Sequence, residues 1–104
     1  MITPAAAGPL GHIALVHEDV ERAEALAKML RNTGQRITVV PSGRRVLQQV
    51  LDCGPDLLMA SLSIADPNVG ALARGVRQAL GPDLPIVVLY KYDAESDTVM
   101  VASV

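Results

Sequence analysis

The chain of 104 residues contains neither phenylalanine nor tryptophan, and only two of its residues are tyrosines. Half of its residues are nevertheless hydrophobic, so the core of a single small domain has to be built from Val, Leu, Ile, Ala and Met. The net charge of −2 argues against a basic face for a phosphate backbone, and aromatic side chains that stack on bases are scarce. We therefore expect no direct contact with nucleic acid.

Cysteine and long hydrophobic runs are also nearly absent. Cys53 is the only cysteine, which excludes an internal disulfide bond and a cysteine-rich metal site. No hydrophobic run approaches the roughly 18 residues of a membrane span. Residues 1–11 lack the basic start and the sustained hydrophobic stretch of a secretory signal. We expect these residues to form a flexible leader, and the chain to be cytoplasmic without contact to a membrane.

The rest of the chain alternates between two hydrophobic patterns. Short hydrophobic runs predict four buried strands, at residues 12–16, 36–40, 56–60 and 86–90. Hydrophobic residues at helical spacing follow each of the first three runs, from Val20, from Val46 and from Leu72. Strands and helices that alternate in this way predict an α/β fold, with a doubly wound parallel sheet covered by helices on both faces.

Polar side chains stand where the predicted strands end. His17, Glu18 and Asp19 follow the first strand, Ser61 follows the third, and Tyr90 ends the fourth. Ligands of such sheets bind at the carboxyl ends of the strands, near the point where the strand order reverses. We therefore expect these side chains to share one pocket, although Asp19 is also well placed to cap the following helix.

Three stretches in the expected order resemble the receiver domains of two-component response regulators. "HIALVHEDVERAEALAKMLRNTG" is similar to their first strand, acidic pair and first helix, and "GPDLLMASLS" to their third strand and phosphoacceptor turn. "PDLPIVVLYKYDAES" is similar to the run into and out of their fourth strand. The resemblance covers residues 12 to about 100. It implies the flavodoxin-like receiver fold with strand order 2-1-3-4, and a signalling role in a two-component or related phosphorelay system.

The resemblance also shows which groups are replaced. The two adjacent acids that hold Mg²⁺ in the family fall at His17 and Glu18, the phosphoacceptor aspartate at Ser61, and a small hydroxyl residue at Tyr90. A serine hydroxyl is a poor nucleophile unless a base lies beside it, and Mg²⁺ prefers carboxylates and waters. We expect a degenerate phosphorylation pocket without enzymatic activity or cofactor, and weak or absent Mg²⁺ binding at Glu18 and Asp19.

The C-terminal end departs from the family as well. The family's fifth strand and its terminal lysine have no counterpart before Val104, so residues 12–104 are predicted to be a receiver-like domain that is incomplete at its C-terminus. A missing fifth strand would leave the edge of the fourth strand unpaired, and such an edge templates pairing with another chain. We expect a chain that is either a homodimer through this edge or marginally stable. Residues 97–104 are rich in β-branched residues, which favour a strand.

The leading hypothesis is a pseudo-receiver that acts through phosphorylation-independent contacts with a regulatory or effector protein. The family places the interaction surface around the fourth strand and the segment after it, which here gives Tyr90, Lys91, Tyr92, Val99 and Val101.

The alternative is a small-ligand-binding or catalytic domain on the same fold, with a pocket of His17, Glu18, Ser61 and Tyr90. The loop after the first strand lacks the glycines of a phosphate-binding loop, and Ser61 lacks the flanking glycines of a nucleophile elbow. His12, which precedes the first run, is expected to be exposed.

Overall fold

The computed structural model describes residues 11–65, 67–93 and 98–103, with the backbone alone for residues 90–93 and 98–103. The predicted leader, apart from Gly11, lies outside the described residues. The elements follow one another as β1 (His12–His17), α2 (Val20–Arg31), β2 (Arg36–Pro41), α3 (Val46–Cys53), β3 (Leu57–Ser61), α4 (Val69–Leu80), β4 (Ile86–Asp93) and β5 (Thr98–Ser103).

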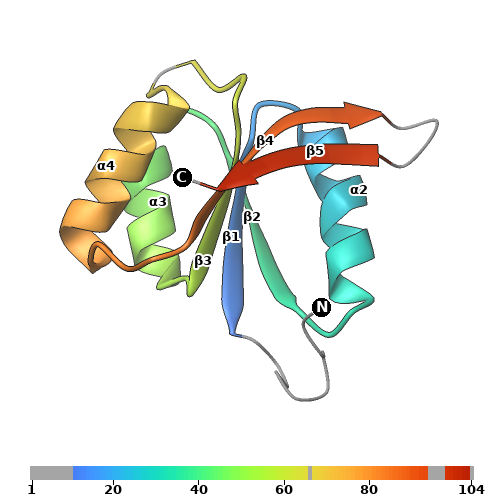
Figure 1. Cartoon of the computed structure of the whole chain (residues 1–104), viewed down its shortest axis with the longest axis horizontal. Coiled ribbons are helices and arrows are strands. Elements are labelled where there is room, and N and C mark those ends of the chain that lie inside the picture. The colour runs from blue at the N-terminus through green and yellow to red at the C-terminus, as the bar shows by residue number, and fades with distance from the viewer. Residues whose placement is uncertain (1–10, 66, 94–97, 104) are drawn as a thin grey trace.

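The strands form one sheet in the order β2-β1-β3-β4-β5 (Figure 1). β1 pairs in parallel with β2 and β3, and β3 pairs in parallel with β4, so the predicted parallel order 2-1-3-4 is confirmed. The predicted strands are hydrophobic throughout because helices cover both faces of the sheet. The α/β fold class predicted from the alternating pattern is therefore the observed one.

Helices cover the two faces unequally. α3 and α4 lie on one face, whereas α2 is the helix on the other (Figure 1). Gly75 lets α4 approach α3 closely, because a Cβ at this position would lie 2.9 Å from Cδ2 of Leu47. The core under α3 and α4 consists of Ala14, Val16, Val40, Val46, Val50, Leu58, Ala60, Ile64, Leu72, Val76 and Ile86. The smaller core under α2 consists of Leu15, Ala23, Leu26, Ala27, Ile37 and Leu89.

The outer edge of β4 differs from the expectation. β5 pairs with β4 in antiparallel orientation, with Tyr92 opposite Val99 and Lys91 opposite Met100. The prediction of an unpaired β4 edge is therefore wrong, and β5 is instead the terminal strand of the described sheet, while the homodimer stays a prediction. The physical reason is the length of the connection: residues 94–97 suffice for an antiparallel return, whereas a parallel fifth strand needs a crossover of about a dozen residues or more.

The described helices are short. Among residues 11–65, 67–93 and 98–103, no helix is long and hydrophobic enough to cross a bilayer.

Candidate functional site

The predicted pocket residues lie at the carboxyl edge of the sheet. His17 is the last residue of β1 and Ser61 the last residue of β3, and these two strands are direct neighbours. Ser61 is paired with Leu89 of β4, so the backbone of Tyr90 follows at the same edge. The pairing of β4 with β5 shifts register between Leu89 and Lys91, which places a bulge at Tyr90. The Tyr90 side chain lies outside the described part of the chain.

Glu18 is the centre of the described site. The hydroxyls of Ser61 and Ser63 and the backbone N–H of Glu18 are the hydrogen-bonding groups that act on its carboxylate. Its Oε1 also lies 3.1 Å from Nδ1 of His17. Burial acts to raise the pKa of Glu18, but the backbone N–H, the Ser61 hydroxyl, His17 and the Ser63 hydroxyl together lower this pKa below its ordinary value. Glu18 is therefore held as a hydrogen-bonded carboxylate.

Ser61 is integrated into the turn that follows β3. Ser61 is only 4% exposed, and its hydroxyl oxygen accepts a hydrogen bond from the backbone N–H of Ser63 at 3.2 Å. The carbonyl of Ser61 accepts from Ile64 N at 3.4 Å, which closes the turn. A buried hydroxyl that both accepts and donates has its hydrogen-bonding capacity in use. Ser61 is therefore a structural group of this turn.

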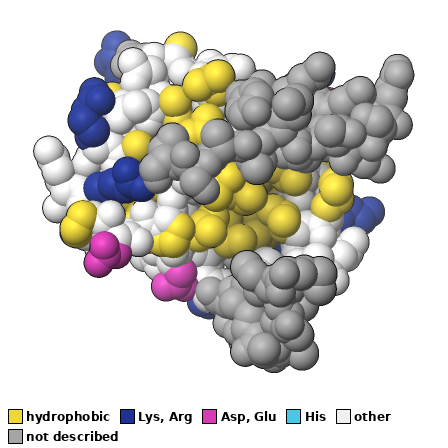
Figure 2. All heavy atoms as spheres, viewed as in Figure 1, with side chains coloured by type: hydrophobic (Ala, Val, Ile, Leu, Met, Phe, Trp, Pro, Cys, Tyr) yellow, Lys and Arg dark blue, Asp and Glu magenta, His cyan; other side chains and the backbone are white. Residues whose placement is uncertain are grey.

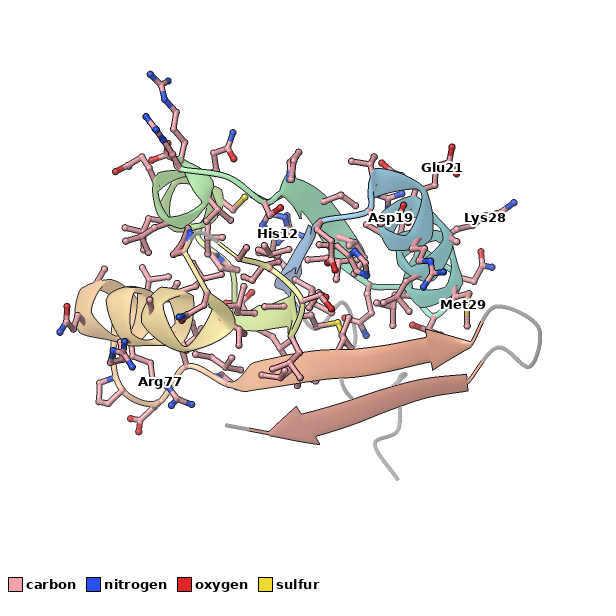
Figure 3. All side chains as sticks on the ribbon, turned by 90° about the horizontal axis from the view of Figure 1, so that it is seen from above. His12, Asp19, Glu21, Lys28, Met29 and Arg77 are labelled. Carbon is pink, nitrogen blue, oxygen red and sulfur yellow. The ribbon has the colours of Figure 1, made fainter. Side chains whose placement is uncertain are left out.

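His17 and Asp19 join the site to the start of α2. Nδ1 of His17 accepts from the backbone N–H of Asp19 at 2.9 Å. Asp19 is the N-cap of α2, and its Oδ1 accepts from the backbone N–H of Arg22 at 3.2 Å. Figure 3 shows Asp19 at the first turn of this helix. The prediction that Asp19 caps the helix is confirmed, and its carboxylate is committed to that role.

The donor set does not match the Mg²⁺ site that the resemblance implies. The Asp19 carboxylate binds the start of α2, with Oδ2 3.5 Å from Nε of Arg22. The Glu18 carboxylate already accepts from two serine hydroxyls. Among the described residues, no group of three His, Cys, Asp or Glu side chains is placed to hold a metal ion. Mg²⁺ is usually bound through one or two carboxylates together with waters, and both carboxylates here already have other partners.

The contacts also bear on the catalytic alternative. The described hydrogen bonds of the Ser61 side chain go to Glu18 and to the backbone of Ser63. The group beside the hydroxyl is thus a carboxylate with a lowered pKa, which is a weak general base at neutral pH. This geometry does not activate Ser61 as a nucleophile.

Two contacts were missed in the sequence. Ser63 is a second donor to Glu18, and the signal for it was a Ser-x-Ser pattern at the exit of a strand. His12 is half-buried rather than exposed, so that prediction is wrong. Its Nδ1 lies 3.2 Å from the carbonyl of Cys53, and its Nε2 is hydrogen-bonded to the hydroxyl of Thr38. His12 belongs to β1, where its neighbours in space come from β2 and α3.

The chain was compared with protein-family models, with curated proteins and with solved structures. No family model matches the chain. It is 27% identical over 82 residues to the transcriptional regulatory protein ZraR of Escherichia coli K12, a match that covers 79% of this chain and 18% of ZraR. The chain thus spans about a fifth of the length of this curated relative.

Solved structures agree with the sequence match. The N-terminal domain of a response regulator receiver protein from Methanoculleus marisnigri has a TM-score of 0.69 at 19% identity, over 85% of this chain and 73% of that one. The receiver domain of a histidine kinase from Syntrophus aciditrophicus has a TM-score of 0.65 at 27% identity, over 84% and 67%. The pseudo-receiver domain of CikA has a TM-score of 0.56 at 24% identity, over 75% and 66%.

These matches and the strand order agree on one fold. The chain has the flavodoxin-like fold of response regulator receiver domains and resembles both receivers and pseudo-receivers. In sequence and fold the chain is similar to signalling domains of the two-component type.

Proposed function

We propose that the chain is a pseudo-receiver, which signals through contacts with a protein partner and without phosphorylation of its own pocket. The observation that carries the proposal is the state of Ser61, whose buried hydroxyl donates to Glu18 at the end of β3. Transfer of a phosphoryl group needs a strong nucleophile and a divalent cation that offsets the charge of the group. The site supplies a committed hydroxyl and an already hydrogen-bonded carboxylate, so we propose neither phosphoryl transfer nor another enzymatic activity.

The partner surface is proposed on the β4–β5 hairpin. β5 is the last strand of the described sheet, and a terminal strand presents backbone N–H and C=O groups to a partner. The register places Tyr92 opposite Val99 and Leu89 opposite Val101. The proposed surface comprises Tyr90, Lys91, Tyr92, Val99 and Val101. Strand addition at such an edge uses the backbone for affinity and alternate side chains for specificity, which suits a regulatory or effector protein in the cytoplasm.

Phosphorylation independence is tested with the full chain, Mg²⁺ and acetyl phosphate or beryllofluoride. The proposal expects unchanged amide NMR spectra and an unchanged intact mass, because a serine stands at position 61 and the Glu18 carboxylate is already hydrogen-bonded. The matched control is the double variant His17→Asp/Ser61→Asp, which restores an acidic residue at both positions and should gain a response to Mg²⁺. Shifts centred on Glu18 and Ser61 in the unmodified chain at millimolar ligand would contradict the proposal.

The partner surface is tested separately by photo-crosslinking in cells of the source organism. A photoreactive residue at position 92 should give a crosslinked protein, and the same residue at Glu21 on exposed α2 serves as the control. The crosslink should persist in Ser61→Ala, because the contact does not depend on the pocket. Equal crosslinking from both positions, or its loss in Ser61→Ala, would contradict the proposed surface.

A further inference from the structure

A groove lies at the end of the sheet opposite the candidate site. It encloses about 370 Å³, which falls within the range of about 300–1,000 Å³ for binding pockets. Its hydrophobic wall is formed by Ile13, Leu30, Leu57 and Pro85. Ile13 and Leu30 remain partly exposed at the margin of the α2 core, because α2 alone covers this face of the sheet. Figure 2 shows hydrophobic side chains gathered in the middle of the face that it presents.

The groove also contains an acceptor that lacks a donor. Gln35, in the loop after α2, lines the groove, and its Oε1 is buried with no hydrogen-bond partner among the described residues. A buried polar atom without a partner costs about 1–3 kcal/mol. An occupant with a hydrophobic side chain and an N–H group could therefore pack against the hydrophobic wall and donate a hydrogen bond to Oε1 of Gln35.

The chain itself enters at the rim of this groove. The backbone N–H of His12 donates to Oδ2 of Asp56 at 2.8 Å, and Asp56 lines the groove. Gly11 has a φ of 96°, and a Cβ there would lie 1.9 Å from Oδ2 of Asp56, so only glycine permits this close entry. The described part of the chain thus begins at the rim of the groove.

The composition of residues 1–10 suits the groove. The segment "MITPAAAGPL" has no charged side chain and contains Ile2 and Leu10. Each of its residues other than the prolines carries a backbone N–H. Ten extended residues reach about 33–36 Å, which is ample for a groove that begins at Gly11. Tethering through a short linker raises the effective concentration to about the millimolar range. Weak contacts are sufficient at that concentration.

We propose that residues 1–10 bind in this groove as an intramolecular ligand, with hydrophobic side chains against the Ile13–Leu30–Leu57–Pro85 wall and a backbone N–H donating to Oε1 of Gln35. The inference goes beyond the proposed function, because it assigns an occupant to the groove. The β4–β5 hairpin then remains the accessible surface for a partner.

Paramagnetic NMR on the full chain tests the proposal. A nitroxide is attached at Ala5→Cys in a Cys53→Ser background, and amide intensities are compared between its oxidised and reduced states. The amides of Thr33, Gln35 and Leu57 should lose at least half of their intensity, whereas those of the exposed helix α4 should keep it. Uniform broadening, or no broadening at the groove, would overturn the proposal.

Two controls separate the leader from other occupants. Leu10→Ser should weaken the broadening at the groove, and Thr3→Ser in the same segment should leave it unchanged. A mixture of spin-labelled unenriched chain with unlabelled ¹⁵N-enriched chain tests for a second copy. Broadening at the groove in this mixture would mean that a second molecule fills it, which overturns the intramolecular proposal. Circular dichroism checks that each variant is folded.

Discussion

Ser61→Asp provides the sharpest test of the candidate site. Ser61→Asn is its control, because asparagine has nearly the same size as aspartate but no charge. Ser61 is buried and its hydroxyl donates to Glu18, so an aspartate here places a second carboxylate against the first. The two substitutions introduce side chains of nearly equal size. The difference between their free energies of unfolding therefore isolates the charge.

The size of the difference follows from Coulomb's law and the exposure of Glu18. Two unit charges about 4 Å apart interact by about 4 kcal/mol at an effective dielectric constant of 20. The Glu18 side chain is 38% exposed, so water screens part of this repulsion. We expect Ser61→Asp to be less stable than Ser61→Asn by about 1–2 kcal/mol at pH 7.

Urea unfolding followed by far-UV circular dichroism measures this difference. At pH 7 the two urea midpoints should differ by about 1 M, with equal slopes. Two interacting carboxylates cannot both remain ionised at low cost, so one of them takes up a proton as the pH falls. The midpoints should therefore converge on acidification. Equal midpoints at pH 7 would refute the placement of Glu18 beside Ser61.

Three further predictions concern the fold and its dependence on pH. Leu58→Ala should lower the free energy of unfolding by about 2–5 kcal/mol, because Leu58 is fully buried. Leu62→Ala, at a side chain that is 55% exposed, should change it by no more than about 0.5 kcal/mol. Gly11→Ala should destabilise more than Gly34→Ala, since both have positive φ but only Gly11 faces a close neighbour; thermal unfolding measures both. Glu18→Gln should reduce the loss of stability in acid. Because the pKa of Glu18 is lowered in the folded state, its contribution to stability is complete above its ordinary pKa and is lost as the pH falls through its pKa in the folded state. Equal acid sensitivity of this variant and the unmodified chain would contradict that contribution.

Much of the fold could be read from local patterns. The hydrophobic runs at 12–16, 36–40, 56–60 and 86–90 mark strands because a strand buried on both faces has no polar side. Asp19 could be assigned as a helix cap because its side chain acts within three residues of its own position. The strand ends also located the candidate site, since parallel strands bring their carboxyl ends to one edge.

The contacts within the site were less accessible from the sequence. The positions of His17, Glu18 and Ser61 followed from strand ends, but the choice of Glu18 as the shared acceptor did not. A hydrogen bond depends on donor and acceptor positions to within a few tenths of an ångström. Sequence patterns specify the face of an element and not a distance of that kind. Ser63 was missed for the same reason.

The sequence by itself determined the alternating α/β order and the hydrophobic core positions, because these depend on residue type and local spacing. The tertiary structure alone decided the direction of β5, the contacts of His12 and the position of the groove. β5 returns antiparallel to β4, although β-branched composition indicates a strand without giving its direction. His12 is half-buried and contacts Thr38 and Cys53, which are distant in sequence. Among the described helices, α2 alone covers the face where the groove lies, and such coverage is a property of the assembled layers.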